Sequence, residues 1–154
     1  MLNKLAQAKA KWGGSNTLID HWLQHRSELL TSYCELAGIP PFEKHDALPP
    51  IEKIKEFSNL LVDYVSEGHF EVYQQLAKAY EQLGAQVKEH ADQLIEQINP
   101  TTDMALAFND HYANCKSAEE YQGIDLALSK LGEALELRFE IEDALIDILA
   151  SIAA

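Results

Sequence analysis

Hydrophobic residues recur every three to four positions along nearly the whole chain, and Gly and Pro residues interrupt this pattern at intervals. Such a period is typical of helices with one buried face, and no segment shows the strict alternation of a half-buried strand. The pattern therefore predicts an all-α protein. Because short connectors join the amphipathic segments, we expect an antiparallel helical bundle with four core helices plus short accessory helices.

The first half of the chain predicts a short helix over residues 2–11 and a long second helix that ends at Gly38. Gly commonly ends helices because it adopts the left-handed conformation without strain. On the second helix, Trp22 falls within the apolar stripe, so we expect it to be buried. Two Pro-Pro pairs bound the following connector, residues 39–50, and exclude a helix there.

In the second half, the apolar pattern resumes at Ile51, with a stop or kink at Gly68 and a break at Gly84. Asn99-Pro100 is expected to separate two short helices, over residues 87–98 and 104–115, since Pro disrupts a helix interior.

The sequence Ser117-Ala-Glu-Glu120 fits a capping box that opens the last and longest helix. The apolar stripe of this helix extends to Ile152 and includes one acid, Glu142. Gly123 and Gly132 are expected to bend this helix or to let another helix approach closely.

The chain has 154 residues, 47% of them hydrophobic, which is the size and composition of one domain. We therefore expect residues 1–154 to form a single domain whose core needs no disulfide or metal. No apolar run reaches the length of a membrane span, and the N-terminus lacks the apolar region of a signal peptide. These features predict a cytoplasmic protein without membrane contact.

Acidic residues outnumber basic ones, 25 to 12, for a formal net charge of −13. Residues 1–50 are neutral, so the excess of acid begins after the proline-rich connector. This balance argues against nucleic-acid binding, which depends mainly on Lys and Arg. It favours a partner with a basic protein surface, and the alternative is an ordinary solvated helical face.

No metal site is predicted from the histidines. None of the six follows a Glu at the Glu-x-x-His spacing of di-iron bundles, and no HExxH motif is present. His21 and His25 are one helical turn apart and could chelate an ion, but their pattern is also that of residues at the border of an apolar stripe with their tips in water.

No enzyme signature or cofactor motif is found either. Cys34 and Cys115 lack the spacing of metal ligands or disulfides, and Cys34 lies in an apolar stripe, where a thiol packs as a small hydrophobe. Neither GxGxxG nor GxxxxGK[ST] occurs, so no phosphate-binding loop is expected. We therefore predict no catalytic residues and no cofactor.

The segment from Leu61 to Tyr73 is the most informative one for function. If its helix continues through Gly68, then Asp63, Ser66, Glu67 and Phe70 share one face, which would combine an acid, a hydroxyl and an aromatic ring. Such a mixture is typical of a recognition surface. The alternative is that Phe70 belongs to the core and Asp63 is simply solvated.

Three blocks of sequence resemble the regulator of sigma D family, Rsd, and its relative AlgQ, which are bacterial anti-sigma factors. They are residues 14–23 (GSNTLIDHWL), residues 61–73 (LVDYVSEGHFEVY) and residues 132–143 (GEALELRFEIED). Together with the Gly38-Ile-Pro turn they cover nearly the whole chain in the family's order. The resemblance implies a helical bundle without enzymatic activity.

The resemblance also implies a partner, the C-terminal domain of the primary sigma factor, whose basic helix-turn-helix reads the −35 element. An acidic face that competes for the same Arg and Lys residues would sequester sigma from promoter DNA and from core polymerase. The positions that match the family's blocks, and that we expect to bind the partner, are Leu18, Asp20, His21, Asp63, Ser66 and Phe70. The block over residues 132–143 is assigned mostly to folding, with Arg138 placed to pair with Glu142.

Two classes of function remain open at this point. One is a regulator that binds sigma, with other cytoplasmic regulators as further candidate partners, and the other is a small enzymatic or ligand-binding bundle without a recognisable motif. A dry apolar interior would favour the first, whereas a polar pocket with convergent His, Asp or Glu residues would favour the second.

Overall fold

The computed structural model describes residues 5–6, 17–39, 49–67, 72–117 and 119–153, and describes side chains as far as residue 148. Within these ranges the regular structure is helical and no strand is found. Most of the first predicted helix, the region of Gly68 and nearly all of the proline-rich connector lie outside the described residues. The five helices are α2 (Thr17–Ala37), α3 (Ile51–Glu67), α4 (Tyr73–Glu81), α5 (Ala85–Tyr112) and α6 (Ile124–Ala153).

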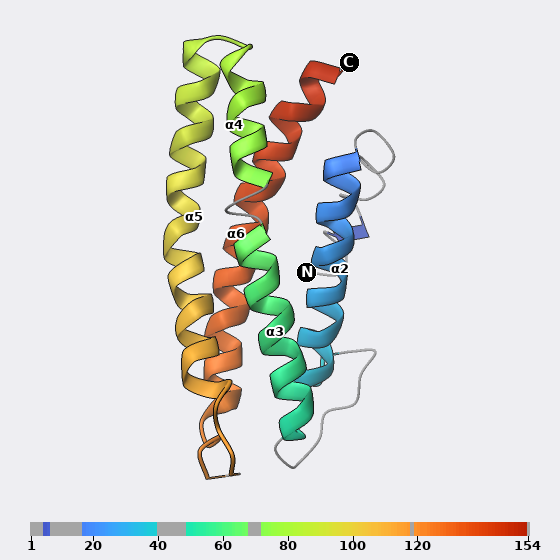
Figure 1. Ribbon diagram of the computed structural model, residues 1–154, viewed down its shortest axis with the longest axis vertical. Coiled ribbons are helices and arrows are strands. Elements are labelled where there is room, and N and C mark those ends of the chain that lie inside the picture. The colour runs from blue at the N-terminus through green and yellow to red at the C-terminus, as the bar shows by residue number, and fades with distance from the viewer. Residues whose placement is uncertain (1–4, 7–16, 40–48, 68–71, 118, 154) are drawn as a thin grey trace.

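The helices form four columns, because α3 and α4 follow one another along the same side of the bundle (Figure 1). Successive columns run in opposite directions. α2 packs on α3, α3 and α4 pack on α5, α5 packs on α6, and α6 closes the ring by packing on α2 and α4. The predicted all-α, antiparallel bundle is confirmed.

The bundle axis is filled by the stripes that the sequence pattern predicts. Trp22 and Cys34 of α2 are buried, as expected, and so are Leu128, Leu135 and Leu145 of α6. The charged side chains lie mainly on the outer faces. Among the described residues, no helix is both long and apolar enough to cross a membrane.

Helix α2 ends at the predicted glycine. Gly38 has a φ of 67°, and the backbone N–H of Ile39 donates to the carbonyl of Cys34 at 3.0 Å. This bond, from the residue after the left-handed position back into the last turn, is the signature of a Schellman motif. It turns the chain away from α2 before the connector to α3.

The prediction of two short helices around Pro100 is wrong, since α5 continues without a break from Ala85 to Tyr112. Pro100 lies on the exposed side, where a carbonyl that loses its partner can bind water. The next residue, Thr101, is buried and donates its hydroxyl to the carbonyl of Ile98 at 2.6 Å. The buried face of α5 continues past Pro100. Met104 and Leu106 lie outside this face, so both are exposed.

The capping box predicted for the last helix is also absent. α6 begins at Ile124, four residues after Glu120, and the carboxylate of Glu120 accepts from the backbone N–H of Lys116 at 3.1 Å. The carboxylate therefore closes a turn before the helix. Gly123 is not inside α6 either, because it precedes the helix with a φ of 84°.

Gly132 does allow a close approach, as expected. A Cβ at this position would overlap the hydroxyl of Tyr33, which comes from α2. That hydroxyl donates to the backbone carbonyl of Leu128 at 2.8 Å. The absent side chain thus lets Tyr33 reach the backbone of α6.

Gly132→Ala is expected to lower the free energy of unfolding by about 1–3 kcal/mol, because the added methyl group overpacks a filled interface. Chemical denaturation followed by circular dichroism measures this loss. The matched control is Ser129→Ala, an exposed position one turn earlier on the same helix, which should change stability by less than about 0.5 kcal/mol. Equal midpoints for the two variants would contradict the close approach.

Candidate functional site

The sequence-predicted binding residues that the structure describes lie on two neighbouring helices. Leu18, Asp20 and His21 are in the first turns of α2, and Asp63 and Ser66 are in the last turns of α3. Because the two helices pack antiparallel, the start of one meets the end of the other. We call this region the α2–α3 seam. Phe70, the sixth predicted residue, lies outside the described residues.

The contact that joins the two groups is made by Glu67, the last residue of α3. One carboxylate oxygen, Oε1, lies 3.0 Å from Nε2 of His21, and the other oxygen, Oε2, contacts Nδ1 of His25. Asp63 is exposed one turn before Glu67, while Leu18 is half-buried against the core. The structure therefore brings the two sequence blocks together.

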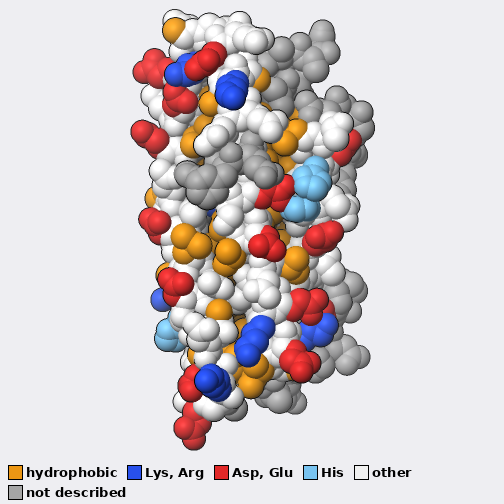
Figure 2. All heavy atoms as spheres, viewed as in Figure 1, with side chains coloured by type: hydrophobic (Ala, Val, Ile, Leu, Met, Phe, Trp, Pro, Cys, Tyr) orange, Lys and Arg blue, Asp and Glu red, His pale blue; other side chains and the backbone are white. Residues whose placement is uncertain are grey.

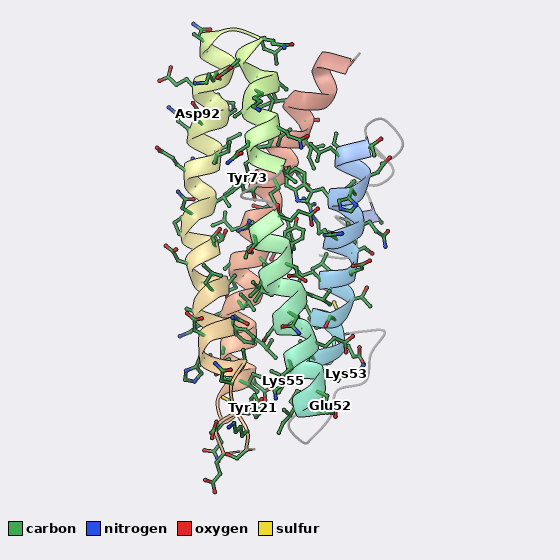
Figure 3. The ribbon with its side chains drawn as sticks, in the orientation of Figure 1. Glu52, Lys53, Lys55, Tyr73, Asp92 and Tyr121 are labelled. Carbon is green, nitrogen blue, oxygen red and sulfur yellow. The ribbon has the colours of Figure 1, made fainter. Side chains whose placement is uncertain are left out.

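Among the described residues of α2 and α3, the seam carries acids with no exposed Lys or Arg beside them. In the described parts of α2 and α3, the exposed cations are Lys53 and Lys55, both in the first turns of α3. Figure 3 shows them at the end of the bundle far from Tyr73, which follows the end of α3. In the space-filling view of Figure 2, red carboxylates are scattered over the face, and some of them adjoin the pale-blue histidine side chains.

A shallow depression continues along the outer surface of α2 and α3. It has a volume of about 470 Å³, and its lining includes the carboxylates of Glu28, Glu35 and Glu56. Lys53 lies 3.6 Å from both Glu35 and Glu56 and neutralises part of this charge at the end away from the seam. The surface is thus most acidic toward Asp63 and Glu67.

The interior of the bundle contains a cluster of charged groups that we call the buried polar cluster. Glu142 of α6 is fully buried and accepts from the hydroxyl of Tyr64 at 2.7 Å. Nη2 of Arg26 and Nε of Arg138 lie 3.9 and 3.8 Å from Oε1 of Glu142. The expected pairing of Arg138 with Glu142 is therefore present, with a second arginine from α2.

Nη2 of Arg26 and Nε of Arg138 are too far from Glu142 for a hydrogen bond and make none among the described residues, whereas the other nitrogens of the two arginines do. Nη1 of Arg26 donates to Oδ1 of Asp143 at 2.6 Å, and Arg138 donates to the hydroxyls of Tyr73 and Thr102 at 2.9 and 2.7 Å. The cluster thus joins α2, α3, α4, α5 and α6.

The buried polar cluster is enclosed by the protein, and burial sets the protonation of its members. Burial raises the pKa of the Glu142 carboxyl, an effect that Arg26 and Arg138 oppose. Burial also raises the pKa of Tyr64, so that its hydroxyl stays protonated and donates to Glu142. Since the carboxylate is fully buried and bound by groups of the protein, it is closed to a substrate.

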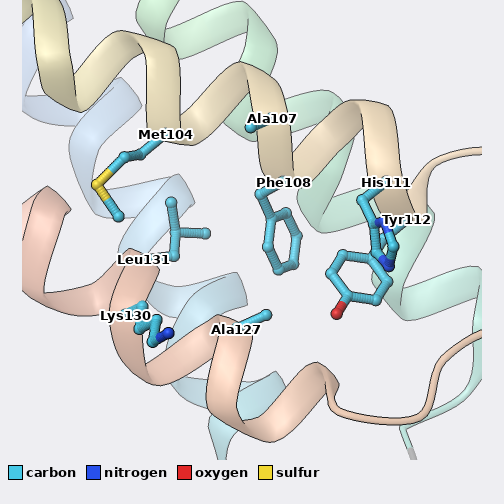
Figure 4. A pocket seen from close by; sticks show the side chains of 8 residues that line it. All are labelled: Met104, Ala107, Phe108, His111, Tyr112, Ala127, Lys130 and Leu131. Carbon is cyan, nitrogen blue, oxygen red and sulfur yellow. The ribbon is translucent and has the colours of Figure 1, made fainter.

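A pocket of about 250 Å³ lies between α5 and α6 (Figure 4). Its lining is mostly apolar and includes Met104, Phe108 and Leu131, with His111, Tyr112 and Lys130 as the ionisable groups. Among the residues that the structure describes, no carboxylate lines this pocket. It therefore lacks the orienting acid that a histidine needs to act as a general base.

Neither cysteine has the surroundings of a reactive nucleophile. Both thiols are buried, and burial raises the pKa of each. A reactive cysteine needs its pKa lowered, because the thiolate is the nucleophile. The assignment of Cys34 to core packing agrees with this environment.

Sequence reasoning missed two residues of consequence. Arg26 was not placed in the core, although it follows Trp22 by one turn and so shares its face. The sequence groups Glu67 only with Asp63, Ser66 and Phe70 of its own face, whereas its contacts with His21 and His25 depend on a helix more than forty residues away. The spacing of Arg26 from Trp22 indicated that Arg26 is buried, whereas the spacing of Glu67 did not indicate its contacts with α2.

Comparison with known proteins assigns this chain to a family. Residues 1–150 match the family Rsd_AlgQ, described as "Regulator of RNA polymerase sigma(70) subunit, Rsd/AlgQ". Similar relatives are named "Regulator of sigma D". The chain is 41% identical over 151 residues to one from Yersinia pseudotuberculosis serotype O:1b (strain IP 31758), 40% over 151 to one from Yersinia enterocolitica serotype O:8 / biotype 1B, and 37% over 147 to one from Enterobacter sp. (strain 638). Each alignment covers 95% of this chain and 87–88% of the relative.

Glu142→Gln is expected to lower the free energy of unfolding by about 3–5 kcal/mol, because it removes the buried negative charge that faces two arginines. Thermal or chemical denaturation measures the loss. The control is Glu133→Gln, an exposed position on the same helix, which should be close to wild type. If Glu142→Gln were as stable as the control, the buried polar cluster would not hold the bundle together.

Proposed function

We propose that this chain, which belongs to the Rsd/AlgQ family of regulators of the RNA polymerase sigma(70) subunit, is an anti-sigma factor without enzymatic activity. It binds the C-terminal domain of the primary sigma factor in the cytoplasm. That domain reads the −35 element with a basic helix-turn-helix. Bound to this protein, sigma is withheld from both promoter DNA and core polymerase, and transcription is regulated by this competition.

The observation that carries the proposal is the charge of the α2–α3 seam. Asp20, Asp63 and Glu67 lie there, whereas Lys53 and Lys55 are at the opposite end of α3. A DNA-reading domain presents Arg and Lys that normally contact phosphates and base edges. Carboxylates at the seam offer these cations an alternative partner and also increase the rate of association.

The depression along α2 and α3 supports the same partner. Its acidic lining, with Glu28 and Glu56 on opposite helices, suits a basic helix laid along the groove. A helix in a groove is a frequent mode of protein recognition. The lining of the depression also includes Gln24 and Leu60, which lie one turn from His21 on α2 and from Asp63 on α3, so one partner can reach both the depression and the seam.

The predicted binding residues then take separate roles. Asp63, which is exposed, pairs with an Arg or Lys of sigma, and Ser66 offers a hydroxyl beside it. Leu18 supplies an apolar edge that already packs against the core. His21 contributes an exposed ring next to Glu67. Phe70 is proposed as the apolar anchor.

The competing proposal of an enzymatic or ligand-binding bundle receives less support. The feature that would favour this proposal over a regulator is a polar pocket with convergent acids and histidines. The interior is indeed polar, but the buried polar cluster is closed around Glu142, and the α5–α6 pocket pairs its histidine with no acid. Both observations favour a regulator that acts by binding.

Asp63→Ala is expected to weaken binding to the purified C-terminal domain of sigma by about 2–5 kcal/mol, because it leaves a partly desolvated cation without its partner. Titration calorimetry measures the change, and melting curves should stay close to wild type because Asp63 is exposed. Added salt should weaken the wild-type complex more than that of the variant. Phe70→Ala is expected to cost about 2 kcal/mol or more as an anchor.

The matched control is Asp103→Ala, which removes an exposed carboxylate from α5 on another part of the bundle. It should bind like wild type. If the wild-type protein fails to bind the sigma domain, the proposed partner is wrong. If the wild type binds but Asp63→Ala and Phe70→Ala bind equally well, the partner stands and the proposed surface is wrong.

A further inference from the structure

Three side chains at the α2–α3 seam form a cluster with the chemistry of a metal site. His21 and His25 lie one turn apart on α2, with ring centroids 4.3 Å apart, and Glu67 faces both from the end of α3. One ligand atom from each residue lies within 4.8 Å of the others. The three atoms come from two helices that the bundle holds in fixed register.

These separations match those that a metal ion requires. Zn²⁺ binds imidazole nitrogen and carboxylate oxygen at about 2.0–2.2 Å in tetrahedral geometry, which places two ligand atoms about 3.3–3.5 Å apart. The distance of 3.0 Å between Nε2 of His21 and Oε1 of Glu67 is close to this value. Both histidine–carboxylate contacts are shorter than the separation of two zinc ligands, so the side chains would rotate outward to admit an ion among the three atoms.

The donor set is also informative. Two imidazoles and one carboxylate form the three-ligand set of open zinc sites, in which a water or another group fills the fourth position. We propose that His21, His25 and Glu67 bind one divalent transition-metal ion, with Zn²⁺ as the probe that represents this class.

The electrostatics of the seam favour a cation at this point. Glu67 is the C-terminal residue of α3, where the helix dipole is negative, and the last turn of α3 contains no basic residue. Asp63 adds a second carboxylate one turn earlier. A divalent ion would relieve this accumulation of negative charge more fully than one protonated imidazole.

The cluster is open to solvent on one side and supported on the other. The side chain of His21 is 58% exposed, that of His25 31%, and that of Glu67 only 16%. An ion can therefore enter from solvent beside His21, while Glu67 is held against the packed side of the seam. The simpler alternative is an ordinary ion pair between the carboxylate and a protonated histidine.

Titration calorimetry of the chelator-treated full chain with Zn²⁺ distinguishes these alternatives. We expect one ion per chain, and we expect His21→Ala, His25→Ala and Glu67→Gln each to weaken binding by at least about tenfold, since each removes a ligand. His90→Ala is the matched control, because it removes an exposed histidine on α5 outside the cluster. It should bind Zn²⁺ like wild type.

Thermal melting provides a second measurement that does not depend on heats of binding. An ion that binds only the folded state raises the melting temperature as its concentration rises. This rise should be present in wild type and His90→Ala and reduced in the three cluster variants, each of which should itself fold, as judged by circular dichroism.

Several results would overturn the proposal. The absence of Zn²⁺ binding by the wild type would leave the ion pair as the explanation of the cluster. Retained affinity in Glu67→Gln would show a two-histidine chelate without the carboxylate, and equal losses in the cluster variants and His90→Ala would show unspecific binding. The test uses the protein alone, so its outcome is independent of whether sigma is the partner.

Discussion

The buried carboxylate of Glu142 is the group around which the bundle is organised. Removing a charge from water costs several kcal/mol, and the structure offsets this cost with two arginines and the hydroxyl of Tyr64. Arg138 lies on α6 with Glu142, but Arg26 and Tyr64 come from α2 and α3, so their contacts with the carboxylate form only when these helices adopt the native register. An apolar core of the same volume would tolerate sliding of one helix past another, whereas this charged core does not.

The fixed register of the helices also determines how the surface residues of α2 and α3 meet. Arg26 ties α2 to α6 through Asp143, and Tyr64 ties α3 to α6 by donating to Glu142, while its hydroxyl accepts from Nε1 of Trp22 at 2.9 Å. Tyr64 is three residues before Glu67, and Trp22 lies between His21 and His25. Because the inward-facing residues fix the two helices against each other, the outward-facing ones meet in one arrangement. The geometry of the seam is thus a consequence of the core.

The sequence predicts the parts of this structure that depend on local pattern. Apolar spacing locates the buried faces of α2, α3 and α6, and Gly38 marks the end of α2, because each signal lies within a few residues of its effect. The errors arise where the local structure depends on its surroundings in the folded protein rather than on the local sequence pattern. Pro100 does not break α5, since its exposed position lets the helix continue. The carboxylate of Glu120, in the predicted capping box, closes a turn before α6 instead of capping that helix.

At the candidate site as well, the sequence predicts what depends on one helix but not what depends on the packing of two. Helical spacing correctly grouped Asp63, Ser66 and Glu67 on one face, but the pairing of that face with His21 and His25 depends on the register between two helices. The partners of Glu67 on α2 could not be read from the sequence, because helical spacing relates Glu67 only to residues of its own helix. In the bundle it turns toward α2, while Asp63 remains exposed one turn away. A basic partner and a metal ion would therefore use neighbouring carboxylates of one acidic seam, and the core of the bundle sets the position of both.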